Sequence, residues 1–374
     1  MEVKSPNLFS PTCDFMFDPE KRAELLRPKM MKDGKYLITK IKGSGEEFKH
    51  EEEKIVYKDY FKFKWYLKPE FFSTKEIWSH KLVGLSENFW SVPLRQIKKI
   101  RFQNPPYSAA YRLNKEPKNY NKALTVQAAG CNYDCNFCYI PKDLNSANLK
   151  YGKYFSAKEI IEIFLKARKV SNEPLNVIRL TGGEIIITPE IIIDIYEELE
   201  KRDLNEVYIW IDTNLSTKRY IENVENGLKP IFKKRNVGVI GCFKGVSKED
   251  FSIITGAEQR FYENQFKTAK LFLDWKADFY AYLPALVYEN NIEAKIKGFI
   301  EKLRLLNKNL PLRIEVDMIV EYSSALINMI EKSKQGRPLP KTDQRTFFDL
   351  WYNKLLPIYY SKKMLNKFSC EVPL

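Results

Sequence analysis

Three cysteines stand close together near the middle of the chain, at Cys131, Cys135 and Cys138, and Tyr139 directly follows the last of them. Three thiolates can hold three irons of a four-iron, four-sulfur cube, which leaves the fourth iron without a protein ligand. A cluster that only carries electrons normally has all four of its irons ligated by protein. The spacing therefore indicates a reactive cluster whose fourth iron binds another molecule.

Other uses of these cysteines fit the sequence less well. Zinc usually takes four ligands, commonly as paired cysteines or with histidine, and both histidines, His50 and His80, lie in the amino-terminal region. Cys13, Cys242 and Cys370 are scattered singly and offer no second pair. Clustered cysteines in a cytosolic chain are more often metal ligands than disulfide partners. The alternatives are a zinc site, or a fully ligated cluster that recruits one of the scattered cysteines.

Polar residues also end the strands that we expect downstream of the cysteines. Gly182 and Gly183 allow a ligand to approach the backbone closely, and the carboxylate of Glu184 can accept a hydrogen bond from an ammonium group. Asp212 and Asn214 end the next strand, where an Asx turn explains either residue equally well. A further strand is followed by Lys244, and polar residues on later strands could also face inward: Tyr280, Tyr282, Glu315, Asp317 and Glu321.

The elements that would position these residues alternate along the chain from about residue 123. Mostly apolar strands that alternate with amphipathic helices indicate a parallel sheet in an α/β fold. Ser156 is a good N-cap for the first of the helices, and Pro189 opens the second. We predict strands at 124–128, 176–181, 206–213, 238–243, 277–287 and 313–320, and helices at 156–165, 190–201, 258–274 and 292–306.

The cysteine spacing and the downstream strand ends together resemble those of the radical S-adenosylmethionine (SAM) superfamily. The resemblance covers roughly residues 120–320. It implies a [4Fe-4S] cluster on the three cysteines, with the open iron bound by the amine and carboxylate of SAM. It also implies that a reduced flavodoxin or ferredoxin supplies an electron, that SAM is cleaved, and that a 5′-deoxyadenosyl radical removes a hydrogen from the substrate.

The resemblance also assigns roles to individual residues. Backbone near Tyr139 would meet the adenine of SAM, the Gly182-Gly183-Glu184 turn would hold the methionyl amine, and Asp212 and Asn214 would meet the ribose or the substrate. Leu215 stands where the family usually has glycine. Lys244, which precedes a Thr255-Gly256 turn, resembles the lysine of the branch that activates glycyl-radical enzymes and would pair with the SAM carboxylate. Cys242 replaces the acid of that branch and is expected to be a small buried residue.

The fold that the resemblance implies is an incomplete (β/α)6 barrel at 119–330, since a full eight-unit barrel needs about 250 residues. An amino-terminal α+β region at 1–118 would precede it. This region leans toward β structure because polar and apolar residues partly alternate at 35–41 and 54–66. A carboxy-terminal extension at 331–374 would contain a helix at 342–356, with an apolar face of Phe347, Phe348, Leu350, Trp351 and Leu355.

Composition bounds the class of protein and its partners. Of the 374 residues 44% are hydrophobic, which allows a substantial core, and no apolar run is long enough for a transmembrane helix. The start of the chain lacks a signal peptide, so we expect a cytoplasmic protein without membrane partners. Residues 1–118 hold 24 basic and 16 acidic residues, and 331–374 hold 9 and 4. Basic flanks could engage RNA, although a lysine-rich solvated surface explains them as well.

Three functions compete on this sequence. The first is a radical SAM enzyme that acts on a protein or peptide. The second is a radical SAM enzyme that modifies RNA. The third is a non-enzymatic electron-transfer or structural metal protein.

Overall fold

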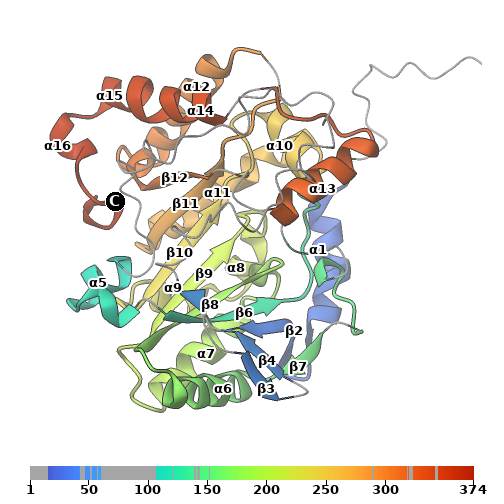
Figure 1. Cartoon of the computed structure of the whole chain (residues 1–374), viewed down its shortest axis with the longest axis vertical. Coiled ribbons are helices and arrows are strands. Elements are labelled where there is room, and N and C mark those ends of the chain that lie inside the picture. The colour runs from blue at the N-terminus through green and yellow to red at the C-terminus, as the bar shows by residue number, and fades with distance from the viewer. Residues whose placement is uncertain are drawn as a thin grey trace, which may run out of the picture.

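The computed structural model describes residues 16–42, 107–120, 122–138, 140, 144–150, 152–288, 290–317, 319, 323–341 and 344–374, together with short strands at 47–50, 53–56 and 58–59. A mixed sheet with α-helices packed around it forms the body of the molecule (Figure 1). None of the described helices is both long and apolar enough to cross a bilayer.

Six parallel strands make up most of the sheet, and their order in the sheet is the same as their order along the chain. All six strand predictions are confirmed, although several strands are shorter than predicted. The strands are β6 (Lys122–Ala128), β8 (Leu175–Gly182), β9 (Tyr208–Thr213), β10 (Val237–Cys242), β11 (Asp278–Pro284) and β12 (Ile314–Asp317). Their carboxyl ends therefore meet at one edge of the sheet, as a shared site requires.

Helices connect successive parallel strands. The four predicted helices are confirmed as α6 (Ala157–Val170), α7 (Glu190–Glu200), α11 (Tyr262–Asp274) and α12 (Ile292–Leu306). Ser156 caps α6 in a reciprocal capping box with Glu159, and Pro189 occupies the N-cap of α7 rather than its first turn. Three shorter helices were not predicted: α8 (Lys218–Asn223), α9 (Glu225–Phe232) and α10 (Lys248–Thr255).

The amino-terminal residues extend the sheet on the far side of β6. The predicted strand at 35–41 is confirmed as β2 (Lys35–Lys42), which pairs antiparallel with β6, with β1 (Met31–Lys32) and with β7 (Lys153–Phe155). β3 (Glu47–His50) pairs with β4 (Glu53–Val56), and β5 (Lys58–Asp59) pairs with β6. Most of the predicted strand at 54–66 lies outside the described residues.

Two helices in this region were not predicted. The first, α1 (Pro19–Met30), starts at Asp18, whose side chain accepts hydrogen bonds from the amides of Glu20 and Lys21. Six of its twelve residues are charged and it contains Pro28, and its buried residues form only a narrow apolar stripe: Pro19, Ala23, Leu26 and Met30. The second, α5 (Tyr107–Leu113), leads through a short 3₁₀ helix (Pro117–Tyr120) into β6.

The carboxy-terminal residues form several short helices instead of one. The predicted helix at 342–356 is divided into α14 (Gln344–Phe348), a π-helix (Asp349–Leu355) and α15 (Leu356–Tyr359), and α16 (Lys362–Leu365) follows. The predicted apolar face is confirmed, since Phe347, Leu350, Trp351 and Leu355 are buried in the main core. An unpredicted helix, α13 (Ser323–Lys334), lies before them, on the same side of the sheet as α1 and α10 in Figure 1.

The inner face of the parallel strands changes character along its length. Near the amino ends, Trp210 lies between Tyr208 and Tyr280 in a buried aromatic cluster. One step toward the carboxyl ends, alternation along the strands brings polar and partly exposed residues to the same face. These residues are Arg179, Asp212, Cys242 and Tyr282. The sheet therefore has a closed aromatic floor below a polar layer.

Candidate functional site

The three cysteines lie on the loop that follows β6, at the carboxyl end of the sheet. The amide of Cys131 donates to the carbonyl of Asn145 at 2.8 Å. The amides of Asp134 and Asn136 donate to the last carbonyls of α10, those of Thr255 and Ile254, at 3.0 and 2.9 Å. The Thr255-Gly256 turn therefore contacts the cysteine loop directly. Loop and helix end satisfy each other's backbone groups, which holds the loop in place.

The cysteine sulfurs have polar partners. None of the three cysteines is in a disulfide, and Cys135 is the most buried, with 8% exposed. The side-chain amide of Asn214 lies 3.7 Å from the sulfur of Cys131, and that of Asn145 lies 3.3 Å from the sulfur of Cys138. N–H groups aimed at sulfur are the usual surroundings of cluster thiolates, because they stabilise negative charge on the cluster.

The protonation of these thiols also depends on burial. Burial raises the pKa of all three thiols, and it raises that of Cys135 to about 12. In the metal-free protein the groups are therefore thiols at neutral pH, and binding of iron must displace their protons.

The donor set suits a cluster better than a single ion. Among the described residues, no group of three or more His, Cys, Asp or Glu side chains converges closely enough to hold one metal ion. Ligands of a four-iron cube bind separate irons, so their sulfurs do not need to converge on one point. Cys370 lies in the inner-face cluster near the aromatic floor, away from the cysteine loop. Cys13 lies outside the described residues.

The two glycines at the end of β8 pack against the backbone of the cysteine loop. A Cβ atom on Gly183 would lie 1.8 Å from the carbonyl oxygen of Gly130, the residue before Cys131. A Cβ on Gly182, whose φ is +106°, would lie 2.7 Å from backbone atoms of Ala128. The amides of Gly183 and Glu184 donate to the carbonyls of Ala128 and Gly130 at 3.0 and 2.8 Å. Both positions therefore require glycine, because the backbone of Ala128 and Gly130 packs too close to leave room for a side chain.

Glu184 is completely buried and joins the ends of two strands. Its carboxylate accepts hydrogen bonds from the Thr213 hydroxyl at 2.8 Å and from the backbone amides of Asn214 at 2.6 Å and Ile186 at 3.2 Å. Burial raises the pKa of Glu184 to about 7, against the opposing effect of these hydrogen bonds. A carboxylate has about four acceptor positions, so one remains after these three bonds.

Asn214 faces the cysteine loop. Its amide nitrogen donates to Asn132 at 2.9 Å and its oxygen accepts from the amide of Ser216 at 3.0 Å, which places it beside Cys131. The next residue, Leu215, has a φ of +62°, so the position where the family usually has glycine is left-handed here too. Leu215 is fully buried.

Asp212 has a different environment from Asn214. Arg179 on β8 binds it, with Nη2 2.5 Å and Nε 2.8 Å from its Oδ2. The other carboxylate oxygen, Oδ1, is buried without a hydrogen-bond partner among the described residues. Asp212 therefore lies in the polar layer on the inner face with one acceptor atom available, while Asn214 is occupied at the loop.

Lys244 lies beside the cysteine loop. Its ammonium lies 5.2 Å from the ring centroid of Phe137, the residue before Cys138. Burial by itself would lower the pKa of Lys244, but the neighbouring sulfurs of Cys242, Cys135 and Cys131 raise it overall. Lys244 is thus held as a cation beside the cysteine loop.

The remaining predicted residues lie either in the buried aromatic floor or in the polar layer on the inner face of the sheet. Tyr280 is fully buried in the floor, where its hydroxyl donates to Asp278 at 3.2 Å. Tyr282, Glu315 and Asp317 are partly exposed on the inner face. Cys242 was expected to be a small buried residue and is half-buried beside Tyr282. Burial raises its pKa to about 11. Tyr139 and Glu321 lie outside the described residues.

Several residues that contact the cysteine loop were not predicted. Asn132 and Asn145 carry no recognisable spacing: Asn132 donates to Ser216, which is 84 positions away, and Asn145 donates to Cys138 from seven positions further along the chain. Asn328, Lys332 and Arg337 come from α13 and the turn after it. Asn132 lies within the cysteine motif itself, and only its polar side chain could have indicated a role in the site.

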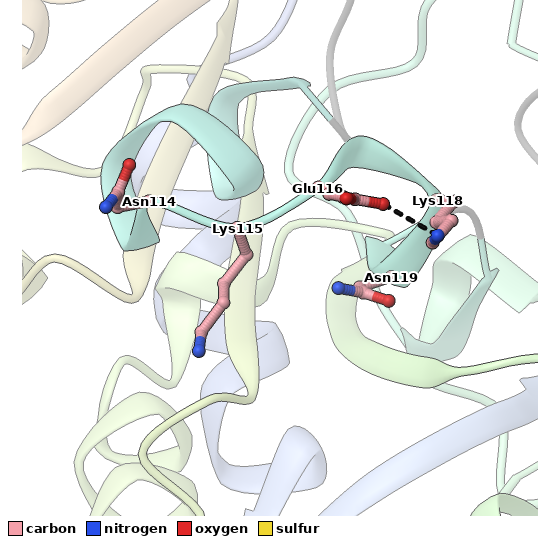
Figure 2. A pocket seen from close by; sticks show the side chains of 5 residues that line it. All are labelled: Asn114, Lys115, Glu116, Lys118 and Asn119. Atoms are coloured by element: carbon pink, nitrogen blue, oxygen red, sulfur yellow. Dashed lines mark ion pairs between the residues drawn. The ribbon is translucent and has the colours of Figure 1, made fainter.

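A surface pocket also occurs where α5 leads into β6, lined by Asn114, Lys115, Glu116, Lys118 and Asn119 (Figure 2). It is wide open, and two of its lining residues, Glu116 and Lys118, form an ion pair at 2.7 Å. Because it precedes the first parallel strand, it lies toward the amino ends of the strands, opposite the cysteine loop.

Comparisons with known proteins agree with the site. A family model described as the radical SAM superfamily matches residues 126–250, which include the three cysteines and Lys244. The 7-carboxy-7-deazaguanine synthase of Methanothermobacter thermautotrophicus is 32% identical over 85 residues, which cover 23% of this chain and 32% of that protein. The pyruvate formate-lyase-activating enzyme of Clostridium pasteurianum is 25% identical over 142 residues, which cover 38% of this chain and 53% of that enzyme.

This chain therefore spans about a third and about half of the length of these two relatives. Among solved structures, Streptococcus suis SuiB bound to its precursor peptide SuiA matches with a TM-score of 0.34 at 18% identity, over 48% of this chain and 36% of that one. The family match shows that residues 126–250 form a radical SAM domain.

Proposed function

We propose that this enzyme holds a [4Fe-4S] cluster on Cys131, Cys135 and Cys138 and uses it to cleave SAM reductively. The observation that carries the proposal is the cysteine loop at the carboxyl ends of the strands, with side-chain amides beside two of its sulfurs. When bound, cluster and SAM supply an electron and a 5′-deoxyadenosyl radical that removes a hydrogen atom from the substrate.

The chain's own residues would orient these groups. Asn145 and Asn214 stabilise the charge on Cys138 and Cys131. Lys244, a cation beside the loop, suits the carboxylate of SAM. Glu184 retains one acceptor position for the amine of SAM, and it fixes Asn214 through the backbone. Tyr139 stays a prediction for the adenine contact.

The polar layer on the inner face would meet the substrate. Asp212 presents its unpaired Oδ1 there, and the aromatic floor of Tyr208, Trp210 and Tyr280 closes the site toward the amino ends. A dry floor protects a radical from side reactions. The six parallel strands, each followed by helical structure, support an open (β/α)6 barrel at 119–330 between the proposed regions 1–118 and 331–374.

We further propose that the substrate is a protein or peptide and that a reduced flavodoxin or ferredoxin supplies the electron. The support is the similarity to an enzyme named for activating pyruvate formate-lyase, at 25% identity over 142 residues. The substrate proposal is separate from the chemistry of SAM cleavage and is tested separately, by incubating the reconstituted enzyme with candidate peptides and with tRNA.

Anaerobic reconstitution with iron, sulfide, SAM and dithionite tests the SAM cleavage. We expect 5′-deoxyadenosine from the wild type, none from Cys135→Ala, and wild-type amounts from the matched variant Cys370→Ala, since Cys370 lies near the floor. An intact cluster in the wild type that yields no 5′-deoxyadenosine would refute the proposed function.

A further inference from the structure

Helix α13 lies directly against the cysteine loop, although its residues follow the loop by almost two hundred positions. The side-chain amide of Asn328 donates to the backbone carbonyls of Cys135 and Cys138, at 3.2 and 3.3 Å. One side chain therefore bridges two of the three proposed cluster ligands. A hydrogen bond to each carbonyl fixes the orientation of the peptide that follows each cysteine, and with it the path of the loop.

An ion triad joins the same two segments. Asp134, which lies between the first two cysteines, accepts from Lys332 at 2.5 Å and from Arg337 at 2.8 Å, both at Oδ2. Arg337 also donates to the backbone carbonyl of Asp134 at 2.6 Å. The side chains of Lys332 and Arg337 are only 8% and 11% exposed, and that of Asp134 is 22% exposed. Water therefore screens these interactions much less than it screens a surface pair.

The end of α13 is shaped to bring Arg337 to the loop. Gly336 has a φ of +91°, and the amide of Arg337 turns back to the carbonyl of Lys332 at 3.1 Å, which ends the helix. The guanidinium then lies over the Thr255-Gly256 turn, so closely that a Cβ on Gly256 would be 2.4 Å from its Nη2. The cysteine loop is thus held between α10 on one side and α13 on the other.

Apolar packing completes this contact. Phe137 packs against a small cluster that is separate from the main core. Met329 of α13 and Ile254 of α10 both belong to this cluster, together with Leu286 and Tyr288. Phe137 therefore anchors the loop between the two helices, while Asn328, Lys332 and Arg337 fix its backbone and its one carboxylate.

We propose that Asn328, Lys332 and Arg337 are positioning residues that hold the cysteine loop in its ligating arrangement, so that α13 and the turn after it are part of the cluster site. The effect on cluster binding rests on the proposed function. The contacts that hold the loop are present in the metal-free chain and do not depend on it. Lys332 and Arg337 together outweigh the single charge of Asp134. The triad therefore also places a net positive charge beside a site of three thiolates.

The first experiment uses the metal-free full chain. Cys135 is 8% exposed, so alkylation by iodoacetamide, located by peptide mass spectrometry, measures how often the loop opens. We expect the double variant Lys332→Ala/Arg337→Ala to be alkylated at Cys135 about tenfold faster than the wild type, because Asp134 loses both of its cationic partners while the backbone bonds to α10 remain. Lys334→Ala, which changes an exposed lysine of the same helix, serves as the matched control and should behave as the wild type.

The second experiment measures the cluster. After anaerobic reconstitution, we expect Asn328→Ala and the double variant to retain less iron and sulfide per chain in competition with a chelator. Loss of an outer-shell partner typically lowers metal affinity by about 10–100-fold. The electron paramagnetic resonance spectrum of the reduced cluster, with and without SAM, should also change. Circular dichroism of each metal-free variant verifies that the fold is retained.

The outcomes separate this inference from the proposed function. Unchanged alkylation of Cys135 in a folded double variant would overturn it, and so would faster alkylation with unchanged iron retention and spectra. A wild type that binds no cluster would refute the proposed function, and would with it remove the cluster role that we assign to α13. A wild type that binds a cluster but cleaves no SAM would contradict the proposed function while the inference about α13 stands or falls on its own measurements.

Discussion

Replacement of Gly183 by alanine tests the reasoning about the glycine turn most directly. The new Cβ would lie 1.8 Å from the carbonyl oxygen of Gly130 and 3.2 Å from the amide nitrogen of Cys131. Real Cβ atoms come no closer than 3.0 Å to such atoms, so the backbone must move by more than an ångström. That movement breaks the hydrogen bonds of Gly183 to Ala128 and of Glu184 to Gly130, at 3.0 and 2.8 Å.

The expected cost follows from these contacts. Each lost hydrogen bond contributes about 1 kcal/mol, and forced overpacking adds about 1–3 kcal/mol. Gly183→Ala should therefore lower the free energy of unfolding of the metal-free protein by about 3–5 kcal/mol. Because the displaced atoms adjoin Cys131, iron retention after reconstitution should fall as well.

Urea unfolding followed by circular dichroism measures the change. Gly298→Ala is the matched control, because nothing lies within 4 Å of a Cβ at this glycine of α12. Alanine there should stabilise the helix by about 0.5–1 kcal/mol. If Gly183→Ala unfolds within 1 kcal/mol of the wild type and retains iron, the close approach of the two loops does not exist as described.

Three further predictions concern neighbouring residues. Burial raises the pKa of Glu184 from 4.5 to about 7, so its ionisation opposes folding and the metal-free protein should lose up to about 3 kcal/mol of stability as pH rises from 4.5 through 7. Glu184→Gln should remove this part of the pH dependence in urea unfolding at pH 5 and pH 8, and an unaltered dependence would contradict the assignment. Asn145→Ala removes an N–H from the sulfur of Cys138 and should lower the midpoint potential of the cluster in a redox titration, whereas the exposed Asn148→Ala should leave it unchanged. Leu215 is fully buried with a φ of +62°, so both Leu215→Gly and Leu215→Ala should be destabilised, but the glycine variant should be more stable by about 1 kcal/mol, the reverse of the usual order.

Prediction from sequence succeeded where a pattern is repeated over several residues. The six parallel strands and four of their helices follow from apolar runs and amphipathic spacing, and Ser156 was recognised as a cap. It failed for α1 and α13, because half of the residues of α1 are charged and its apolar stripe is narrow, and because the side chains of α13 that matter bind a loop far away in the chain. No local pattern of α13 identifies such a partner.

For the site, the sequence indicated which strand ends lie beside the cysteine loop, but not what the residues there contact. Gly182 and Gly183 were predicted to admit a ligand, but the atoms that approach them belong to Ala128 and Gly130. Asn214 was predicted to meet the ribose or substrate, and it is bonded to Asn132 in the cysteine loop. The sequence shows which polar residues follow each predicted strand. The side of a turn on which another loop packs depends on tertiary contacts that the sequence does not display.

The separation between Asp134 and Arg337 has a consequence for how the enzyme is made. These two residues are 203 positions apart in the chain. Synthesis proceeds from the amino terminus at about 5–20 residues per second, and domains begin to fold as they emerge. The cysteines therefore leave the ribosome at least about ten seconds before the segment that secures their loop. During that interval the loop lacks its contacts with Asn328, Lys332 and Arg337, so iron delivery is expected to follow the synthesis of α13.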